Sequence, residues 1–261
     1  MAKKKNTVNA KNVVIFGAMG AGKSSLINLI ADKKIAKTGS DLKRCTLTWT
    51  KYVLPQFFDD GMQCNIFDTM GIENPELESD EYHRSIKNAS RLLRKLDECG
   101  GTSLLVYCVK KQRVNSALRN NYQLFHEVLY QRRVPIVMVV TCLEDEKVME
   151  EWWTRNRASL EEFRIAVKGH ACVTTLKDRD VMMKYKTSRE AMHGLIRQHA
   201  AITPVSGEWK QEGMFSAFMR PFKKPDPEDK DKEDKLQEDL EGQCGMQKEL
   251  ASKVAKAFVY T

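Results

Sequence analysis

The sequence predicts a three-layer α/β domain, built on a mostly parallel six-stranded sheet with one antiparallel edge strand and followed by a charged C-terminal tail. Up to residue 200, apolar runs of strand length alternate with runs of helix length. This alternation is typical of a sheet whose parallel strands are joined by helices. It ends after Pro204, and residues 223–241 consist largely of Lys, Asp and Glu. We therefore expect one domain over residues 10–210 and a disordered or partly helical tail over residues 211–261.

Each predicted strand is a short run of apolar, β-branched or aromatic residues bounded by turn-forming residues. The predicted strands cover residues 12–17, 46–54, 62–68, 103–109, 135–142 and 170–175. Pro55 and the sequence Asp59-Asp60-Gly61 separate the second strand from the third, so we expect these two to form an antiparallel hairpin. The predicted helices, which are longer and lie between the strands, cover residues 23–34, 80–99, 116–131, 147–166 and 188–200.

Two further segments have patterns that leave alternatives open. In the helix over 147–166, we expect one of Trp152 and Trp153 to pack in the core and the other to lie at its rim. Residues 248–259 have the pattern of a weakly amphipathic helix, and a solvated tail is the alternative.

Charge is unevenly distributed along the 261 residues. The net charge is +8, and residues 223–261 contain 8 Lys against 10 Asp or Glu, so residues 1–222 carry +10. A basic body suits polyphosphate ligands, acidic proteins or an anionic membrane surface, although solvation alone accounts for most surface charges. The seven cysteines form no CxxC pair, which indicates reduced thiols rather than disulfides or a zinc site. No apolar run is long enough to span a bilayer and no secretory segment is present, so we expect a cytoplasmic protein with peripheral membrane contact at most.

A glycine-rich sequence follows the first predicted strand and opens the first predicted helix. It matches the phosphate-loop pattern G-x-x-x-x-G-K-[ST] in the residues Gly17, Ala18, Met19, Gly20, Ala21, Gly22, Lys23 and Ser24, with Ser25 next in the helix. Small residues let backbone N–H groups point inward at a phosphate, and the helix directs its positive end at the same anion. Lys23 provides a charge for the outer phosphates, and the Ser24 hydroxyl provides a ligand for Mg²⁺. A glycine-rich turn with a surface lysine is the alternative interpretation.

A second motif, D-x-x-G, ends the third predicted strand with Asp68 and Gly71. An aspartate beside a phosphate loop can hold a water on Mg²⁺, and a glycine N–H can meet a γ-phosphate. The polar stretch between the two motifs, residues 37–50, is where a switch would carry one hydroxyl that reaches Mg²⁺. We predict Thr46 for this role because it directly precedes the hairpin strand, with Thr48 as second choice; an ordinary strand threonine is the alternative for either.

The chain resembles the GTPase superfamily of Ras-like topology in the order of its motifs. These are GAMGAGKSS, then a switch containing Cys45-Thr46, then FDTMG. Within this superfamily the chain is similar to the septin-related branch, which includes the immune-associated and chloroplast-import GTPases, and in particular to fungal single-G-domain proteins. Those proteins carry a segment like Thr141-Cys142-Leu143-Glu144 with Trp152-Trp153. The resemblance spans residues 12–200 and implies binding of GTP and GDP with Mg²⁺.

The base-recognition motif of the superfamily is [NT]-K-x-D, whose acid accepts hydrogen bonds from guanine. The resemblance places Thr141 and Glu144 at its first and last positions, while Cys142 replaces the lysine. Glutamate is one methylene longer than aspartate, so the expected guanine preference is weakened. Asp145 is an alternative acceptor, and capping of the next helix is an alternative role for Glu144. Residues 173–177 match only weakly the further loop of the superfamily that contacts the base.

Ras-like enzymes place a water-orienting glutamine after the D-x-x-G glycine, whereas this chain has Ile72. The resemblance therefore implies slow, Mg²⁺-dependent GTP hydrolysis, assisted by a partner or by dimerisation through the nucleotide face. It assigns catalytic roles to Lys23, Thr46 and Gly71. It assigns the metal to Ser24, Thr46 and Asp68.

The expected role is a molecular switch or a dimerising scaffold that contacts a protein effector or a membrane surface. One alternative is an interaction module that holds nucleotide without turnover, and a second is a P-loop kinase. Nucleic acid is not an expected partner, because no basic stripe is interleaved with aromatic residues.

Overall fold

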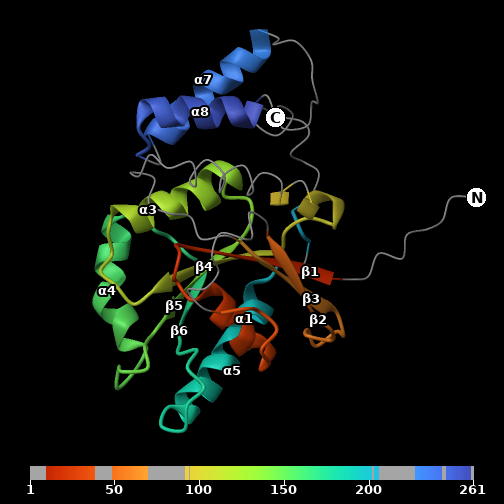
Figure 1. The fold of residues 1–261 in the computed structure, drawn as a ribbon, viewed down its shortest axis with the longest axis vertical. Helices are drawn as coiled ribbons and strands as arrows, with labels where there is room; N and C mark the ends of the chain where they lie inside the picture. The colour runs from red at the N-terminus through yellow and green to blue at the C-terminus, as the bar shows by residue number, and fades with distance from the viewer. Residues whose placement is uncertain are drawn as a thin grey trace, which may run out of the picture.

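A six-stranded sheet forms the centre of the protein (Figure 1). The computed structural model describes residues 10–38, 49–69, 92–93, 95–201, 203–205, 227–242 and 245–259. The strands are β1 (Ala10–Phe16), β2 (Thr50–Leu54), β3 (Gln63–Asp68), β4 (Leu104–Lys110), β5 (Ile136–Thr141) and β6 (Gly169–Cys172). Their order is β2-β3-β1-β4-β5-β6, and every neighbouring pair is parallel except β2 with β3 at the edge. The predicted fold class is therefore confirmed.

Helices cover both faces of the sheet. On one face lie α1 (Lys23–Ala31) and α5 (Met182–His199). On the other lie α3 (Ser116–Tyr122), the π-helix η1 (Gln123–Leu129) and α4 (Glu151–Glu162). Successive side chains of a strand point to opposite faces, so Val13 and Ile15 of β1 join the first cluster while Val14 and Phe16 join the second. Two separate buried cores result, one on each side of the sheet.

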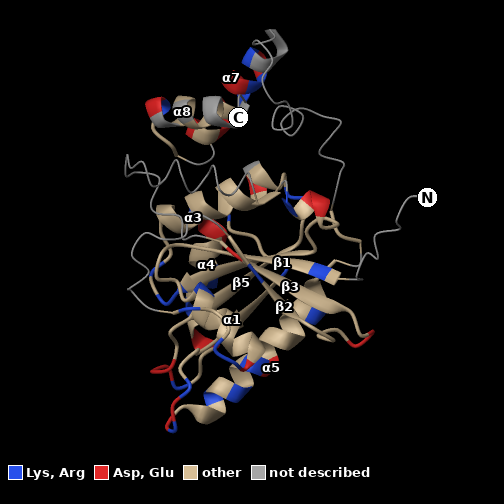
Figure 2. Cartoon of the chain, turned by 45° about the vertical axis from the view of Figure 1, so that its right-hand side comes forward, with Lys and Arg blue, Asp and Glu red and all other residues tan. Residues whose placement is uncertain are grey.

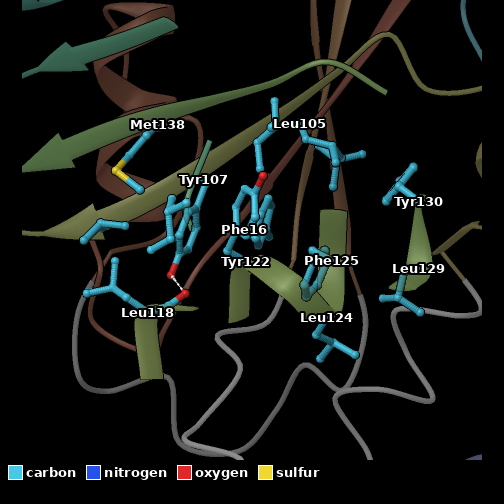
Figure 3. Packing of buried hydrophobic residues seen from close by; sticks show 14 of the residues in the cluster. Phe16, Leu105, Tyr107, Leu118, Tyr122, Leu124, Phe125, Leu129, Tyr130 and Met138 are labelled. Atoms are coloured by element: carbon cyan, nitrogen blue, oxygen red, sulfur yellow. Dashed lines mark hydrogen bonds between the residues drawn. The ribbon is translucent and has the colours of Figure 1, made fainter. Parts of the chain in front are cut away.

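The helix predicted over residues 116–131 changes character halfway along its length. It is α-helical to Tyr122 and then continues as η1. In the close view of Figure 3, Phe125 of η1 lies against Phe16 of β1, with ring centroids 4.2 Å apart, and Tyr107 of β4 stacks on the other side of Phe16 at 4.9 Å. Tyr107 also donates a hydrogen bond to the carbonyl oxygen of Leu118 at 2.9 Å. This aromatic stack ties η1 to the centre of the sheet.

Other predicted boundaries shift by a few residues. The helix predicted from residue 147 begins at Glu151, because residues 144–150 form turns after β5. The last helix of the domain begins earlier than predicted, at Met182. Most of the helix predicted over residues 80–99 falls outside the described residues. Trp152 is buried and Trp153 is half-buried, which confirms the expectation of one core and one rim tryptophan.

The C-terminal region contains two helices, α7 (Pro227–Gly242) and α8 (Lys248–Val259). They pack against each other, and α7 contacts η1. Apolar side chains of the two helices and of Met246 between them belong to the same buried cluster as the α3 face of the sheet, namely Leu236, Leu240, Met246, Ala251, Val254 and Ala255. Of the two states predicted for the tail, the structure shows helix in these two segments (Figure 1). Whether residues 10–210 fold independently of them stays a prediction.

Within the described ranges, no helix combines the length and the apolar character needed to cross a bilayer.

Candidate functional site

The glycine-rich loop connects the carboxyl end of β1 to the first turn of α1. Gly17, Gly20 and Gly22 have φ values of +150°, +73° and +86°, a range that side-chain-bearing residues rarely adopt. A Cβ added to Gly17 would lie 2.0 Å from the carbonyl oxygen of Cys108 in β4. The loop therefore folds tightly over the sheet, in the conformation that the phosphate-loop motif requires.

Lys23 is buried at the start of α1, with only 8% of its surface exposed. Its Nζ donates to the carbonyl oxygens of Gly17 and Ala18 at 3.1 and 2.9 Å, so the side chain folds back across the loop. Burial lowers the pKa of Lys23, and the nearby Asp68 carboxylate opposes that shift. An anion held in the loop would stabilise the charged ammonium group in the same way.

Ser24 and Asp68 meet beside the loop, although they are far apart in the chain. The Ser24 Oγ donates to Asp68 Oδ2 at 2.9 Å. The other oxygen, Asp68 Oδ1, is buried and has no hydrogen-bond partner among the described residues. Burial raises the pKa of Asp68, while the Ser24 hydrogen bond and the Lys23 charge lower it. A hydroxyl and a carboxylate with an unused oxygen are hard oxygen ligands, so this pair fits Mg²⁺.

Two side chains, from the neighbouring strands β4 and β5, form hydrogen bonds with the backbone of the glycine-rich loop. The carbonyl oxygen of Ala21 accepts from Thr141 Oγ1 at 2.9 Å and from Cys108 Sγ at 3.0 Å. Thr141 ends β5 and its side chain is fully buried. This position supports the loop, and the nucleotide contact that the sequence predicts for Thr141 stays a prediction.

The loops after β5 and β6 join at the candidate base site. Glu144 Oε2 accepts from Thr174 Oγ1 at 3.0 Å, and the Thr174 N–H donates to Ser188 Oγ at 3.0 Å. Glu144 is half-buried, whereas Asp145 is exposed. The following helix, α4, begins at Glu151 with Glu150 as its N-cap, so Glu144 does not cap it. The structure thus brings the predicted acid and the weakly matching 173–177 segment together.

Lys184 is a member of this region that the sequence patterns did not reveal. From α5, its Nζ donates to the backbone carbonyl oxygens of Glu144 and Glu146, each at 2.7 Å. Glu146 also binds Lys111 and Arg155 through its carboxylate, at 2.9 Å each. Side chains from α5, from α4 and from the segment just after β4 therefore hold the loop after β5. No motif spans these residues, because they meet only through the fold.

Several predicted site residues cannot be compared with the structure. Thr46, Thr48, Gly71 and Ile72 lie outside the described residues. The five described cysteines are free thiols, and no group of three or more His, Cys, Asp or Glu side chains in the described part of the chain has the geometry of a metal site.

The site consists of a strand, a glycine-rich loop and a helix around a buried lysine, with a serine–aspartate pair beside them. This arrangement defines a P-loop nucleotide-binding protein. Residues 12–142 match the model of the family described as 50S ribosome-binding GTPase. This match spans half of the chain, so the chain belongs to that family of P-loop GTPases and contains its GTP-binding G domain.

Two curated relatives share recognisable sequence with the chain. GTPase Der of Campylobacter fetus subsp. fetus (strain 82-40) is 25% identical over 169 residues, and GTPase Der of Campylobacter concisus (strain 13826) is 26% identical over 167 residues. In both cases the match covers 64% of this chain and 33% of the relative. The chain therefore spans about a third of the length of these relatives.

Solved structures show the same fold at low sequence identity. Era of Aquifex aeolicus bound to GDP·AlF4⁻ aligns with a TM-score of 0.52 and 13% identity, over 77% of this chain and 58% of Era. Toc33 of Arabidopsis thaliana in complex with GDP and Mg²⁺ aligns with a TM-score of 0.50 and 16% identity, over 74% of this chain and 87% of Toc33. These likenesses support the fold and leave the details of the site to the residues themselves.

Proposed function

We propose that this chain binds GTP and GDP together with Mg²⁺, hydrolyses GTP slowly and acts as a molecular switch or a dimerising scaffold. The observation that carries the proposal is the pairing of Ser24 with Asp68, whose second oxygen is buried and unused, next to the buried ammonium group of Lys23. The Lys23 ammonium group can bind an anion and the unused Asp68 oxygen can bind a cation, so the two lie together where ligands of both signs would bind. A Mg²⁺–nucleoside triphosphate complex presents both.

The phosphate loop would hold the phosphates. In this proposal the backbone N–H groups of residues 17–25 and the Lys23 ammonium group bind the phosphate oxygens. Ser24 and Asp68 hold Mg²⁺, Asp68 through a water. When bound, Mg²⁺ would neutralise the negative charge on the outer phosphate oxygens. Thr46 and Gly71 are proposed as the switch residues that meet Mg²⁺ and the γ-phosphate.

We propose that Glu144 recognises the guanine base. Its half-buried carboxylate is oriented by the hydroxyl of Thr174, and Lys184 fixes the backbone around it. An acid held in one orientation can accept the two N–H groups on the edge of guanine, which adenine does not present. Thr141 contributes by supporting the phosphate loop.

Slow turnover is proposed because Ile72 cannot orient an attacking water. The same residue favours the second candidate function, a module that holds nucleotide without hydrolysis.

Within the family of P-loop GTPases, we propose that the chain belongs to the septin-related branch, which includes the fungal single-G-domain proteins. We also propose a homodimer through the nucleotide face; dimerisation is a property of Toc33, of which one solved structure is a dimerisation-deficient mutant. We further propose a cytoplasmic location with a protein effector or peripheral membrane contact.

Nucleotide titration tests the proposal. Wild-type protein with Mg²⁺ should bind GDP and GTP at least tenfold more tightly than ATP, because a half-buried acid left unpaired by adenine costs about 1–3 kcal/mol, on the order of tenfold to a hundredfold. Lys23→Ala should abolish binding of all three, whereas Lys34→Ala, which removes an exposed lysine just beyond α1, should leave it unchanged. Retention of nucleotide by Lys23→Ala would refute the phosphate site, and equal ATP affinity would refute the guanine site.

A single-turnover assay separates the two candidate functions. Release of phosphate from bound GTP over hours, absent in Lys23→Ala, is expected for a slow GTPase. Bound GTP recovered intact would instead establish the holding module.

A further inference from the structure

A second pocket lies at the far end of α1 from the phosphate loop. It has a volume of about 440 Å³ and is lined by residues from the end of α1 and just beyond it, from the β2–β3 hairpin and from α5. The nine residues of α1 separate it from the loop by about 13 Å, at 1.5 Å per residue. Figure 1 shows α1 and α5 side by side on this face of the sheet, close to β2. A pocket of this volume is large enough for a drug-sized molecule.

One wall of the pocket is basic. Arg189, His193 and Arg197 recur every four residues along α5, so they share one face of that helix, and Lys33 adds a further cation from the end of α1. None of the residues that line the pocket is Asp or Glu. Figure 2 shows Lys and Arg along α5 and around its ends.

Of the two arginines that line the pocket, only Arg197 lies within ion-pair distance of an acid in the described part of the chain. Asp59, which is largely exposed, lies 3.7 Å from Arg197 Nη1. Asp32 is bound to Lys177 at 2.7 Å and to the Tyr185 hydroxyl at 3.2 Å. Arg189, by contrast, forms no ion pair within the described part of the chain, although its charge contributes to lowering the pKa of Asp32. An anionic ligand at the guanidinium group would supply the counter-charge and the hydrogen-bond acceptor that Arg189 lacks.

The facing wall is apolar and open to solvent. Ile35 and Val53 are 39% and 49% exposed, two of the few large apolar side chains that are exposed in the described part of the chain. Phe57 closes the wall, with its ring centroid 4.7 Å from that of His193. Exposed apolar side chains that gather at a pocket mark a binding surface.

His193 is not the side chain that would bind the anion. Its Nε2 lies 2.8 Å from the carbonyl oxygen of Ile30 and so must donate to it. Burial lowers the pKa of His193, and the neighbouring Arg189 and Arg197 charges lower it further. Arg197 donates to the carbonyl oxygen of Phe57 through Nε and Nη2, at 3.1 and 2.9 Å. Arg189 is therefore the residue on the α5 face of the pocket that is free to pair with an anion.

We propose that this pocket binds a small organic anion with an apolar body. The anionic group, a carboxylate or a sulfonate, pairs with Arg189, and the apolar body lies against Ile35 and Val53. Both parts are required, because the basic wall alone would select any phosphate and the apolar wall alone would select a neutral molecule. The site is separate from the phosphate loop, so it does not depend on the proposed nucleotide function.

Fluorescence titration with 8-anilinonaphthalene-1-sulfonate tests this proposal in the full chain, with GDP and Mg²⁺ present to keep the probe out of the phosphate loop. Saturable binding at one site per chain is expected, displaced by decanoate and unaffected by inorganic phosphate. Arg189→Gln should weaken binding about tenfold or more, because the charge-assisted hydrogen bond is lost. Val53→Asn, on the opposite wall, should also weaken it.

Lys186→Gln is the matched control, since Lys186 is an exposed cation on the same helix outside the pocket. It should leave probe affinity within about twofold of wild type, as expected for an exposed surface charge. Equal affinities for Arg189→Gln and wild type, or absence of saturable binding, would overturn the proposal. Displacement of the probe by inorganic phosphate as readily as by decanoate would also overturn it, because the apolar body would then be unnecessary. GDP affinity measured on the same variants should not change, which keeps this outcome distinct from that of the nucleotide proposal.

Discussion

At the residue scale, the glycines of the phosphate loop differ in what surrounds them. A Cβ on Gly17 would collide with the backbone of Cys108 at 2.0 Å, whereas a Cβ on Gly20 would meet nothing within 4 Å. Backbone cannot move aside as a flexible side chain can. The need for glycine at position 17 is therefore steric, while at position 20 it is only conformational.

Gly17→Ala should destabilise the fold by about 3 kcal/mol or more, from overpacking and backbone strain together. Gly20→Ala is the matched control and should cost about 1–2 kcal/mol, the strain of a positive φ alone. Urea unfolding of both variants measures the difference. Equal losses would mean that the contact with Cys108 relaxes at little cost.

The hydroxyl of Thr141 links β5 to the phosphate loop. Thr141→Val keeps the shape of the side chain but removes the hydrogen bond to Ala21, which should cost about 1 kcal/mol of stability and weaken GDP binding about fivefold. Thr141→Ser retains the hydroxyl and should bind GDP nearly as wild type does. Calorimetric titration with GDP gives both values, and wild-type affinity in Thr141→Val would show that the loop keeps its shape without this support.

The sequence predicts the core of this site well and its support poorly, for a physical reason. Lys23 and Ser24 are placed by a local strand–loop–helix motif, and Asp68 belongs to a second recognisable motif, D-x-x-G, at the end of the parallel strand next to β1. Cys108 reaches the loop only because β4 pairs with β1. A lone cysteine in an apolar run carries no local signal of such a contact.

At the element scale, the loop after β5 is held by a helix that comes much later in the chain. Lys184 of α5 bridges two carbonyl oxygens of this loop. The conventional lysine of the motif is replaced by Cys142, whose φ of +62° needs a well-supported backbone. We therefore expect Lys184 to act as a positioning residue for Glu144.

Lys184→Met removes the donor while keeping the length of the side chain. If the loop loosens, the ratio of GDP to ADP affinity should fall about tenfold, because base reading depends on the orientation of Glu144 whereas phosphate binding does not. Lys186→Met, from an exposed position on the same helix, should leave that ratio unchanged. A Lys184→Met variant that loses GDP and ADP affinity equally would contradict a role in base recognition.

The π-helix η1 shows where element prediction from sequence reaches its limit. Residues 116–131 have the apolar spacing of a helix, and the structure is helical over 116–129. The widening at Gln123 accompanies the stacking of Phe125 on Phe16 of β1, a contact between distant residues. Local periodicity reports which face of a helix is buried, but not how the facing strand shapes its backbone.

At the scale of the whole molecule, the C-terminal helices complete the core on one face. The charged composition of residues 223–241 favours a solvated segment when it is considered alone. Four residues apart, however, Leu236 and Leu240 form an apolar edge on α7 that reaches the α3 face of the sheet. Gly245, between α7 and α8, lies against the side chain of Asn120 in α3. Burial of a few apolar side chains outweighs the local composition.

Leu240→Ala tests whether these helices are part of one cooperative core. Leu240 is 1% exposed, and truncation of a buried leucine costs about 2–5 kcal/mol. Lys235→Ala, at an exposed position of the same helix, should change the free energy of unfolding by less than about 0.5 kcal/mol. Urea unfolding followed by tryptophan fluorescence is informative here, because Trp152 lies in the same cluster as Leu240. If Leu240→Ala leaves that transition unchanged, α7 and α8 are independent of the GTPase core and the division into residues 10–210 and 211–261 holds; a shift to lower urea shows that the two regions unfold as one unit.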